Sequence, residues 1–159
     1  MSTDQAPASP LTVYAPASIG NLSVGFDALG LALAPMTGAF LGDLVRLMPL
    51  EGGDWKLELT GPFDDDMPPD PEDNIVIACC RAYQEATAER GVAVTPLQVR
   101  LDKRLPIGSG LGSSASSIVA TLEALNRWHD HPLSTLDNFR LMAKLEGQIS
   151  GEIHLDNVA

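Results

Sequence analysis

The chain has 159 residues and a formal net charge of -11, with 45% hydrophobic and 19% charged residues. This length and balance are typical of one globular domain. The negative charge argues against nucleic acid and anionic membranes as partners, because both would be repelled at long range. No apolar run approaches the roughly 18 residues that span a bilayer, and residues 1–10 lack the regions of a signal peptide. We therefore expect a cytoplasmic protein with a flexible leader at residues 1–10 and one domain at residues 11–159.

The first half of the chain predicts an antiparallel sheet. Residues 11–15 are rich in β-formers, and residues 28–34, 43–48 and 55–60 are further strand candidates. Residues 17–27 break this periodicity with glycine, serine, asparagine and aspartate. This composition fits a ligand-binding loop or, equally, a plain connection with local turn bonds. Residues 61–73 are rich in proline and aspartate and predict an exposed, solvated loop rather than a metal site.

Residues 74–90 predict a helix, since apolar side chains recur at helical spacing and Gly91 follows. Asn74 at its start either caps the helix or points its amide into a neighbouring site. Cys79 and Cys80 are adjacent, which suits neither a disulfide nor a metal site, so we expect core thiols in a reducing compartment. Residues 92–101 alternate and predict a strand that leads to a glycine-rich loop.

Three glycines stand within five positions of that loop, at Gly108, Gly110 and Gly112. Residues 113–130 follow with helical periodicity, so the loop opens a helix. The N–H groups of such a turn and the positive end of the helix dipole form an anion site. The loop lacks the lysine of a Walker motif, and its glycine spacing is not that of a Rossmann fingerprint. Arg104 is the nearest cation in sequence.

A further helix is predicted from Ser134 to Glu146 or Gly147, with Gly147 helping to end it. Glu146 shares the apolar face of this helix. A carboxylate that points inward is costly unless it is paired or ligates a cation, although a glutamate at a helix end also reaches water. Together with the hydroxyls of Ser113 and Ser114, Glu146 indicates phosphate and magnesium, because Mg2+ prefers hard oxygen ligands.

At these residues the sequence resembles the GHMP kinases. The stretch 106–115 matches the phosphate-binding motif of that family at every defining position. Residues 15–18, 21–27 and 154–159 resemble the branch that phosphorylates L-homoserine. The resemblance implies an α+β fold, a two-layer arrangement in which helices cover a mixed or antiparallel sheet. It also implies transfer of the γ-phosphoryl group of ATP to the side-chain hydroxyl of L-homoserine, giving O-phospho-L-homoserine for threonine biosynthesis.

The resemblance also implies roles for particular residues. Asn74 lies near the nucleotide, Ser114 and Glu146 coordinate Mg2+, and Asn21, Asp27 and Asn157 contact L-homoserine. Glu146 and Asn157 are thus the expected catalytic residues, and the reaction relies on positioning rather than on a dedicated base such as Asp156. The ATP phosphates are wrapped by the loop and the start of the helix: Pro106, Ile107, Gly108, Ser109, Gly110, Leu111, Gly112, Ser113, Ser114, Ala115 and Ser116.

Family members continue well beyond this length, with a second domain and further substrate-binding arginines. The chain is therefore expected to be an N-terminal portion with little kinase activity alone, and a homodimer of the full-length protein is compatible with the resemblance. Two alternatives stay open. One is another GHMP kinase, such as one acting on mevalonate, and the other is a nucleotide-binding module without catalysis.

Overall fold

The computed structural model describes residues 9–20, 30–36, 38–150 and 157–158. Its main sheet has four strands in the order β1 (Leu11–Pro16), β4 (Gly42–Met48), β6 (Gln98–Asp102) and β5 (Lys56–Thr60). The pairs β1–β4 and β4–β6 are antiparallel, whereas β5–β6 is parallel. The short strands β2 (Ser18–Ile19) and β3 (Leu31–Ala32) form a separate antiparallel ribbon. The sheet is therefore mixed, as expected.

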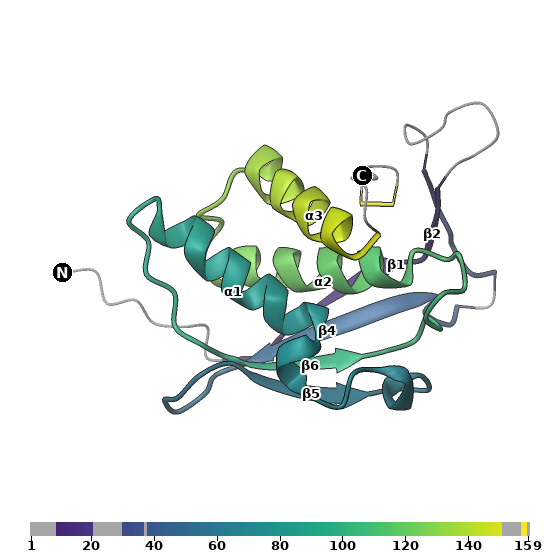
Figure 1. Ribbon diagram of the computed structural model, residues 1–159, viewed down its shortest axis with the longest axis horizontal. Helices are drawn as coiled ribbons and strands as arrows, with labels where there is room; N and C mark the ends of the chain where they lie inside the picture. Colours follow the sequence, from purple (N-terminus) through teal and green to yellow (C-terminus); the bar gives the residue numbers. More distant parts are fainter. Residues whose placement is uncertain (1–8, 21–29, 37, 151–156, 159) are drawn as a thin grey trace.

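Three helices lie on one side of the sheet: α1 (Ile75–Ala88), α2 (Ser113–Trp128) and α3 (Thr135–Ser150). In Figure 1, α1 and α2 lie nearest the strands and α3 packs over α2. The core forms where α2 meets the sheet, because fully buried Ile118 and Leu122 belong to the same cluster as Val45, Leu47 and Leu101. Helices on one face of a mixed sheet make an α+β fold, which confirms the prediction.

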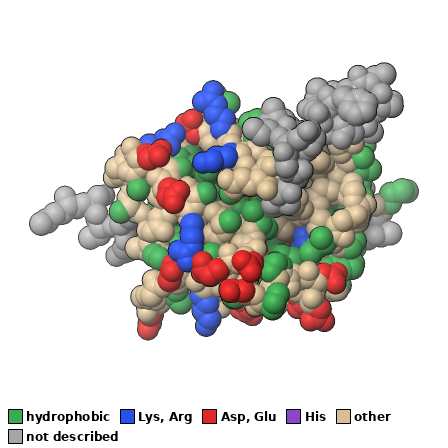
Figure 2. Space-filling model, in the orientation of Figure 1, with side chains coloured by type: hydrophobic (Ala, Val, Ile, Leu, Met, Phe, Trp, Pro, Cys, Tyr) green, Lys and Arg blue, Asp and Glu red, His purple; other side chains and the backbone are tan. Residues whose placement is uncertain are grey.

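Charged side chains of both signs lie on the surface of the domain (Figure 2). Acidic and basic side chains are interspersed on the face shown in Figure 2. None of the helices in the described part of the chain is long and apolar enough to cross a bilayer. Cys79 and Cys80 are both free and buried in α1, as predicted.

The prediction of a strand over residues 92–101 was wrong in its first part, because β6 begins only at Gln98. Pro96 has no N–H to donate to a sheet. The N–H of Val92 instead donates to the carbonyl of Thr87 at 3.0 Å and closes the end of α1. The alternation of apolar side chains over these residues thus reflects packing without strand pairing.

Several other boundaries differ from the prediction. Residues 18–19 of the expected loop 17–27 form β2, and β3 covers only Leu31–Ala32 within the expected strand 28–34. Gly147 does not end α3, which continues to Ser150. A glycine inside a helix costs only about 1 kcal/mol relative to alanine, so the packing of the helix outweighs it. At the other end, the hydroxyl of Ser134 accepts the N–H of Asp137 at 3.2 Å, as a helix cap does. The expected loop 61–73 contains two short 3-10 helices, η1 (Asp64–Asp66) and η2 (Pro71–Asp73).

Candidate active site

The glycine-rich loop joins β6 to α2 and turns sharply at its glycines. Gly108, Gly110 and Gly112 have φ angles of 71°, 73° and 63°, in the left-handed region that side chains other than glycine rarely adopt. Helix α2 starts directly after Gly112, whose carbonyl accepts the N–H of Ser116 at 2.8 Å. The first N–H groups of a helix have no partner within it, so this end of α2 can bind an anion.

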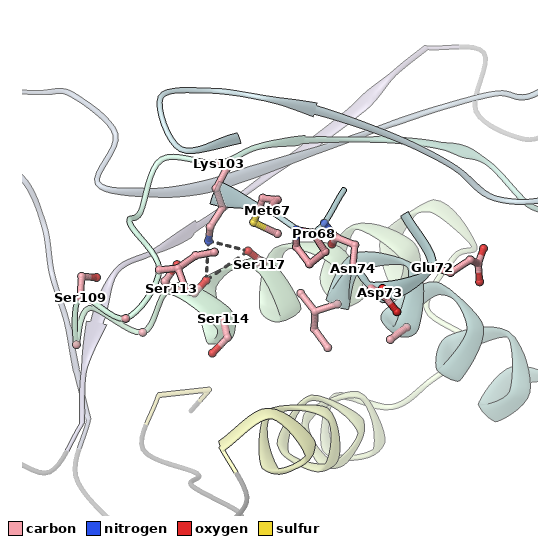
Figure 3. A pocket seen from close by; sticks show the side chains of 16 residues that line it. Met67, Pro68, Glu72, Asp73, Asn74, Lys103, Ser109, Ser113, Ser114 and Ser117 are labelled. Carbon is pink, nitrogen blue, oxygen red and sulfur yellow. Dashed lines mark hydrogen bonds between the residues drawn. The ribbon is translucent and has the colours of Figure 1, made fainter. Parts of the chain in front are cut away.

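A cavity of about 620 Å³ opens between this loop, the start of α1 and the segment at residues 67–68 (Figure 3). A cavity of this volume accommodates a small organic ligand. Hydroxyl groups of Ser113, Ser114 and Ser117 mark one end of it. Apolar side chains line much of the rest of its wall, and they come from Met67, Pro68, Ile75, Ala78 and Ile107. Glu72 and Asp73 line the side away from the serines (Figure 3). Such a cavity suits a ligand with a flat apolar ring at one end and an anionic group at the other.

Asn74 lines this cavity and caps α1 at the same time. Its Oδ1 accepts the N–H of Val76 at 3.0 Å, as a helix cap does. The side chain is 1% exposed, and its Nδ2 has no hydrogen-bond partner among the described residues. A buried N–H donor without a partner is costly, so a ligand acceptor in the cavity would satisfy it. Both readings of Asn74 from the sequence therefore hold in part, since it caps the helix and lines the cavity.

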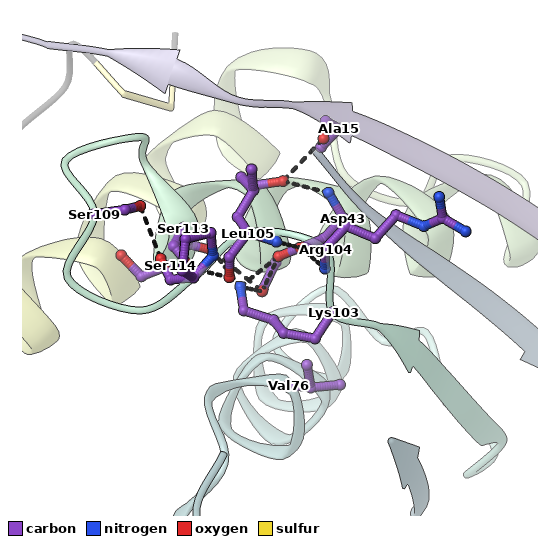
Figure 4. Close-up of polar contacts among 12 residues, drawn as sticks. Ala15, Asp43, Val76, Lys103, Arg104, Leu105, Ser109, Ser113 and Ser114 are labelled. Atoms are coloured by element: carbon purple, nitrogen blue, oxygen red, sulfur yellow. Dashed lines mark hydrogen bonds and ion pairs between the residues drawn. The ribbon is translucent and has the colours of Figure 1, made fainter. Parts of the chain in front are cut away.

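A buried ion pair lies beneath the loop (Figure 4). The ammonium Nζ of Lys103 donates to Asp43 Oδ2 at 2.6 Å, and the two side chains are 2% and 0% exposed. Lys103 also donates to the carbonyl of Ser113 at 2.9 Å and to Ser117 Oγ at 3.1 Å. These three acceptors use all three protons of the ammonium group. Burial lowers the pKa of Lys103, although the charge of Asp43 opposes this shift.

Asp43 fastens the segment that leads into the loop. Its Oδ1 accepts the backbone N–H of Arg104 at 2.8 Å and that of Leu105 at 3.2 Å. Its Oδ2 also accepts the hydroxyl of Ser117 at 2.7 Å. Because strand β4 and helix α2 both contribute to this network, the loop is held to the sheet and to the helix that follows it.

Lys103, rather than Arg104, is the cation at the cavity. Arg104 donates from Nε to Asp102 Oδ2 at 2.8 Å, and its guanidinium lies over the ring of Phe40. Sequence reasoning singled out Arg104 by proximity alone. The alternation of β6 carried the better signal, since buried Val99 and Leu101 are followed at the same spacing by Lys103.

Ser114 and Glu146 meet across two helices at the polar end of the cavity. Ser114 Oγ donates to Glu146 Oε1 at 2.8 Å. Glu146 is 6% exposed, so α3 does aim this carboxylate inward, as its position on the apolar face predicts. Among the described residues, no group of three or more His, Cys, Asp and Glu side chains gathers as a metal site. A Mg2+ ion at Ser114 and Glu146 would therefore complete its shell with phosphate oxygens and water.

A second, smaller cavity of about 100 Å³ lies on the opposite face of the first turns of α2. At 3.6 residues per turn, positions 113, 114 and 117 share one face, and positions 115, 116 and 119 share the other. The first set lines the large cavity and the second set lines the small one. Ser18 and Asn157 complete part of the small cavity, and Ser18 Oγ donates to Asn157 Oδ1 at 3.0 Å.

With this geometry established, residues 74–159 match the model of the GHMP kinases N terminal domain. The chain belongs to the GHMP kinase family. The matched region begins at Asn74 and includes the whole glycine-rich loop as well as Glu146.

Solved GHMP kinase structures share the fold. A homoserine kinase from Cytophaga hutchinsonii is 30% identical with a TM-score of 0.79, covering 97% of this chain and 46% of its own. A protein from Listeria monocytogenes, assigned as a homoserine kinase, is 28% identical with a TM-score of 0.63, covering 95% and 46%. The mevalonate kinase of Methanococcus jannaschii is 18% identical with a TM-score of 0.66, covering 96% and 51%, and shows the fold alone. The chain thus spans about half the length of these structures.

The site residues that the resemblance to the GHMP kinases selects divide into four groups in the structure. Asn21 and Asp27 lie outside the described residues. Pro106, Leu111 and Glu146 line neither cavity, although Glu146 contacts Ser114. Ala115, Ser116 and Asn157 line the small cavity. The large cavity is lined by Asn74, Ile107, Gly108, Ser109, Gly110, Gly112, Ser113 and Ser114.

Sequence reasoning missed Asp43, Lys103 and Ser117. The hydroxyl of Ser116, one of the predicted phosphate-binding residues, is bonded to two backbone groups of the protein. It donates to the carbonyl of Ala15 at 2.8 Å and accepts the N–H of Asp43 at 2.9 Å.

Proposed function

We propose that this chain is the N-terminal, nucleotide-binding half of a kinase that phosphorylates the side-chain hydroxyl of L-homoserine. The observation that carries the proposal is the contact between Ser114 and Glu146 at the polar end of the large cavity. This pair offers hard oxygen ligands beside the amide-rich loop, where a magnesium-bound triphosphate fits. Two homoserine kinase structures at 30% and 28% identity support the choice of substrate.

The large cavity would hold ATP with its base at the apolar end. There the Nδ2 of Asn74 would donate a hydrogen bond to a ring nitrogen of the base. This bond would remove the free-energy cost of burying Nδ2 without a partner. The loop N–H groups and the dipole of α2 would hold the phosphates. Ser114 and Glu146 would hold Mg2+, which neutralises charge on the phosphates during transfer.

The acceptor would approach from the side of the small cavity. Its volume of about 100 Å³ is too small for a nucleotide but admits the alcohol end of a small molecule. Asn157 lines it, and Asn21 and Asp27 are assigned to the same acceptor from the sequence. The carboxylate of Asp27 would pair with the ammonium group of homoserine.

In the reaction, the hydroxyl oxygen of homoserine attacks the γ-phosphorus, the bond from that phosphorus to the bridging oxygen breaks, and ADP leaves. The products are ADP and O-phospho-L-homoserine, which serves threonine biosynthesis, and the hydroxyl proton passes to solvent or to the phosphoryl oxygens. Asn157 carries an amide and accepts no proton. Phosphoryl transfer through a loose transition state needs alignment and charge stabilisation more than a base.

The test is ADP release by the full-length kinase with ATP, Mg2+ and a panel of alcohols. We expect turnover with L-homoserine and little with mevalonate or galactose. Preference for another alcohol would overturn the substrate, and ATP binding without transfer to any alcohol would favour a binding module. The 159-residue chain alone is expected to bind Mg-ADP without measurable transfer.

A further inference from the structure

Ser18 connects the phosphate-binding loop to the segment that carries Asn157. Its backbone N–H donates to the carbonyl of Leu111 in the loop at 3.1 Å. Its hydroxyl proton is shared between two oxygens of Asn157, the side-chain Oδ1 at 3.0 Å and the backbone carbonyl at 3.2 Å. Ser18 is 9% exposed, so both contacts lie in a largely water-excluded place. Buried hydrogen bonds of this kind hold a side chain in one orientation.

Gly112 leaves the space in which this contact forms. A Cβ added at Gly112 would stand 2.3 Å from Ser18 Oγ and 3.3 Å from Asn157 Oδ1. A Cβ added at Gly108 or Gly110 would have no atom within 4 Å, although the backbone turns in the same way at these glycines. The glycine at position 112 therefore serves close packing against Ser18 as well as the turn itself.

We propose that Ser18 is a positioning residue for the acceptor, acting through Asn157. Its hydroxyl engages Oδ1 of the Asn157 amide, so the two N–H donors of Nδ2 remain for an oxygen of the bound alcohol. Because Ser18 also holds Leu111, the donor amide and the phosphate loop keep a fixed spacing. The proposal rests on the proposed function, in which Asn157 contacts the acceptor and the loop holds the phosphates.

Transfer between two substrates depends strongly on such spacing, because a displacement of about 1 Å at the reacting atoms can cost a hundredfold in rate. Without the hydroxyl of Ser18, the Asn157 amide is free to rotate and its segment is released from the loop. Loss of the Ser18 hydroxyl should therefore reduce the rate of transfer to the acceptor, whereas the loop and the cavity that bind ATP stay intact.

The experiment is Ser18→Ala in the full-length kinase, with steady-state kinetics for both substrates. We expect kcat/KM for the acceptor to fall about tenfold or more and KM for ATP to change less than twofold. The matched control is Thr87→Val, which removes another buried hydroxyl, bonded to the carbonyls of Tyr83 and Gln84 in α1. It should leave both constants unchanged. An equal rise of both KM values in Ser18→Ala would contradict the positioning role.

A double-mutant cycle with Asn157→Ala tests whether Ser18 acts through Asn157. In the Asn157→Ala background, Ser18→Ala should cause less than a twofold further loss of kcat/KM, because the amide that it orients is already gone. If the losses of kcat/KM in the two single variants multiply in the double variant, Ser18 acts independently of Asn157 and the proposal is overturned.

The wild-type kinase separates this inference from the proposed function. If it phosphorylates an alcohol other than homoserine, the substrate assignment fails, and the same cycle with that alcohol still decides the role of Ser18. If it phosphorylates homoserine and Ser18→Ala is silent, only the inference fails. If no alcohol is phosphorylated, both proposals fall.

Discussion

Two buried carboxylates near the first turns of α2 have different surroundings. Asp43 is fully buried and its charge is compensated by Lys103, while two backbone N–H groups and a serine hydroxyl complete its hydrogen bonds. Glu146 is 6% exposed and accepts the hydroxyl of Ser114, which lines the large cavity.

The buried charge of Asp43 stabilises the fold, whereas we propose that the buried charge of Glu146 binds a ligand. A carboxylate that receives a lysine and two main-chain N–H groups is matched by the protein itself, so Asp43 stabilises the base of the loop. Glu146 instead accepts a hydroxyl from Ser114, a residue that lines the large cavity. In the proposed function, Glu146 is the carboxylate that would hold Mg2+.

The largest effect is expected for Lys103→Met, which leaves the Asp43 charge buried without its cation. Removing one partner of a buried ion pair typically costs about 3–5 kcal/mol, and we expect about 3 kcal/mol because Asp43 keeps its other donors. Urea denaturation measures this change in the free energy of unfolding. Adding Asp43→Asn to Lys103→Met should recover part of the loss, because the buried charge is then removed.

The control for this variant is Arg81→Met, which breaks the exposed pairs of Arg81 with Glu72 and Asp54. Exposed pairs contribute less than about 1 kcal/mol. If Lys103→Met were no more destabilising than this control, the architectural role of Asp43 would be refuted.

Glu146→Gln should separate ligand binding from folding. The amide oxygen still accepts the hydroxyl of Ser114, so the fold is kept, but the charge that attracts Mg2+ is lost. We expect the enhancement of ADP affinity by Mg2+ to fall at least about tenfold, as judged from losses caused by changes around metal sites. Calorimetric titration with ADP, with and without Mg2+, measures it.

The control for Glu146→Gln is Glu123→Gln, on α2 and paired with Arg127 at the surface. It should leave the Mg2+ effect unchanged. An undiminished Mg2+ enhancement in Glu146→Gln would remove Glu146 from the metal site and leave it as a second architectural carboxylate.

Asn74→Ser separates the two roles of Asn74 with a smaller effect. Serine still caps α1 but offers no amide donor to the cavity. One lost hydrogen bond of about 1 kcal/mol corresponds to a roughly fivefold weaker ADP affinity, while the stability should change by less than about 1 kcal/mol. Asn74→Ala should lose the cap as well, at a further cost of about 1 kcal/mol. Unchanged ADP affinity in both variants would exclude the amide from nucleotide binding.

The smallest change is expected at the two buried thiols of α1, Cys79 and Cys80. Burial raises the pKa of Cys79 and of Cys80, and the charges of Cys80 and Glu146 raise that of Cys79 further. Both thiols therefore stay protonated at pH 8 in the folded chain and should not react with a thiol reagent such as DTNB. Two thiols should react after unfolding in guanidinium, since the chain has two cysteines. Rapid labelling of the folded chain would show that this part of the core opens.

Local patterns were sufficient for the elements and for part of the site. Spacing along α3 placed Glu146 on the buried face, and the loop of Gly108, Gly110 and Gly112 predicted a turn into a helix. Alternation misled at residues 92–97, where Pro96 cannot donate to a sheet. The same alternation also predicts that Lys103 is buried, because it follows Val99 and Leu101 at the same spacing. This signal was not used, and Arg104 was chosen only because it lies near the loop in the sequence.

Contacts between segments that are far apart in the chain could not be predicted from local spacing. Lys103 and Asp43 are 60 residues apart, and the residues around either one do not identify the other as its partner. Ser18 and Asn157 are 139 residues apart and meet because Gly112 lies between them without a side chain. No local periodicity encodes such pairs, since they depend on how the sheet and α2 pack together.

The sequence by itself determined most of the helices and strands and the glycine-rich loop, because these depend on the spacing of neighbouring residues, and its resemblance to the GHMP kinases indicated the α+β class and the family. Only the tertiary structure decided which carboxylate is compensated by a lysine and which contacts a serine that lines a cavity. It also decided that α2 separates a large cavity from a small one. The physical reason is that burial, charge compensation and close approach belong to pairs of residues, which the fold brings together from different parts of the chain.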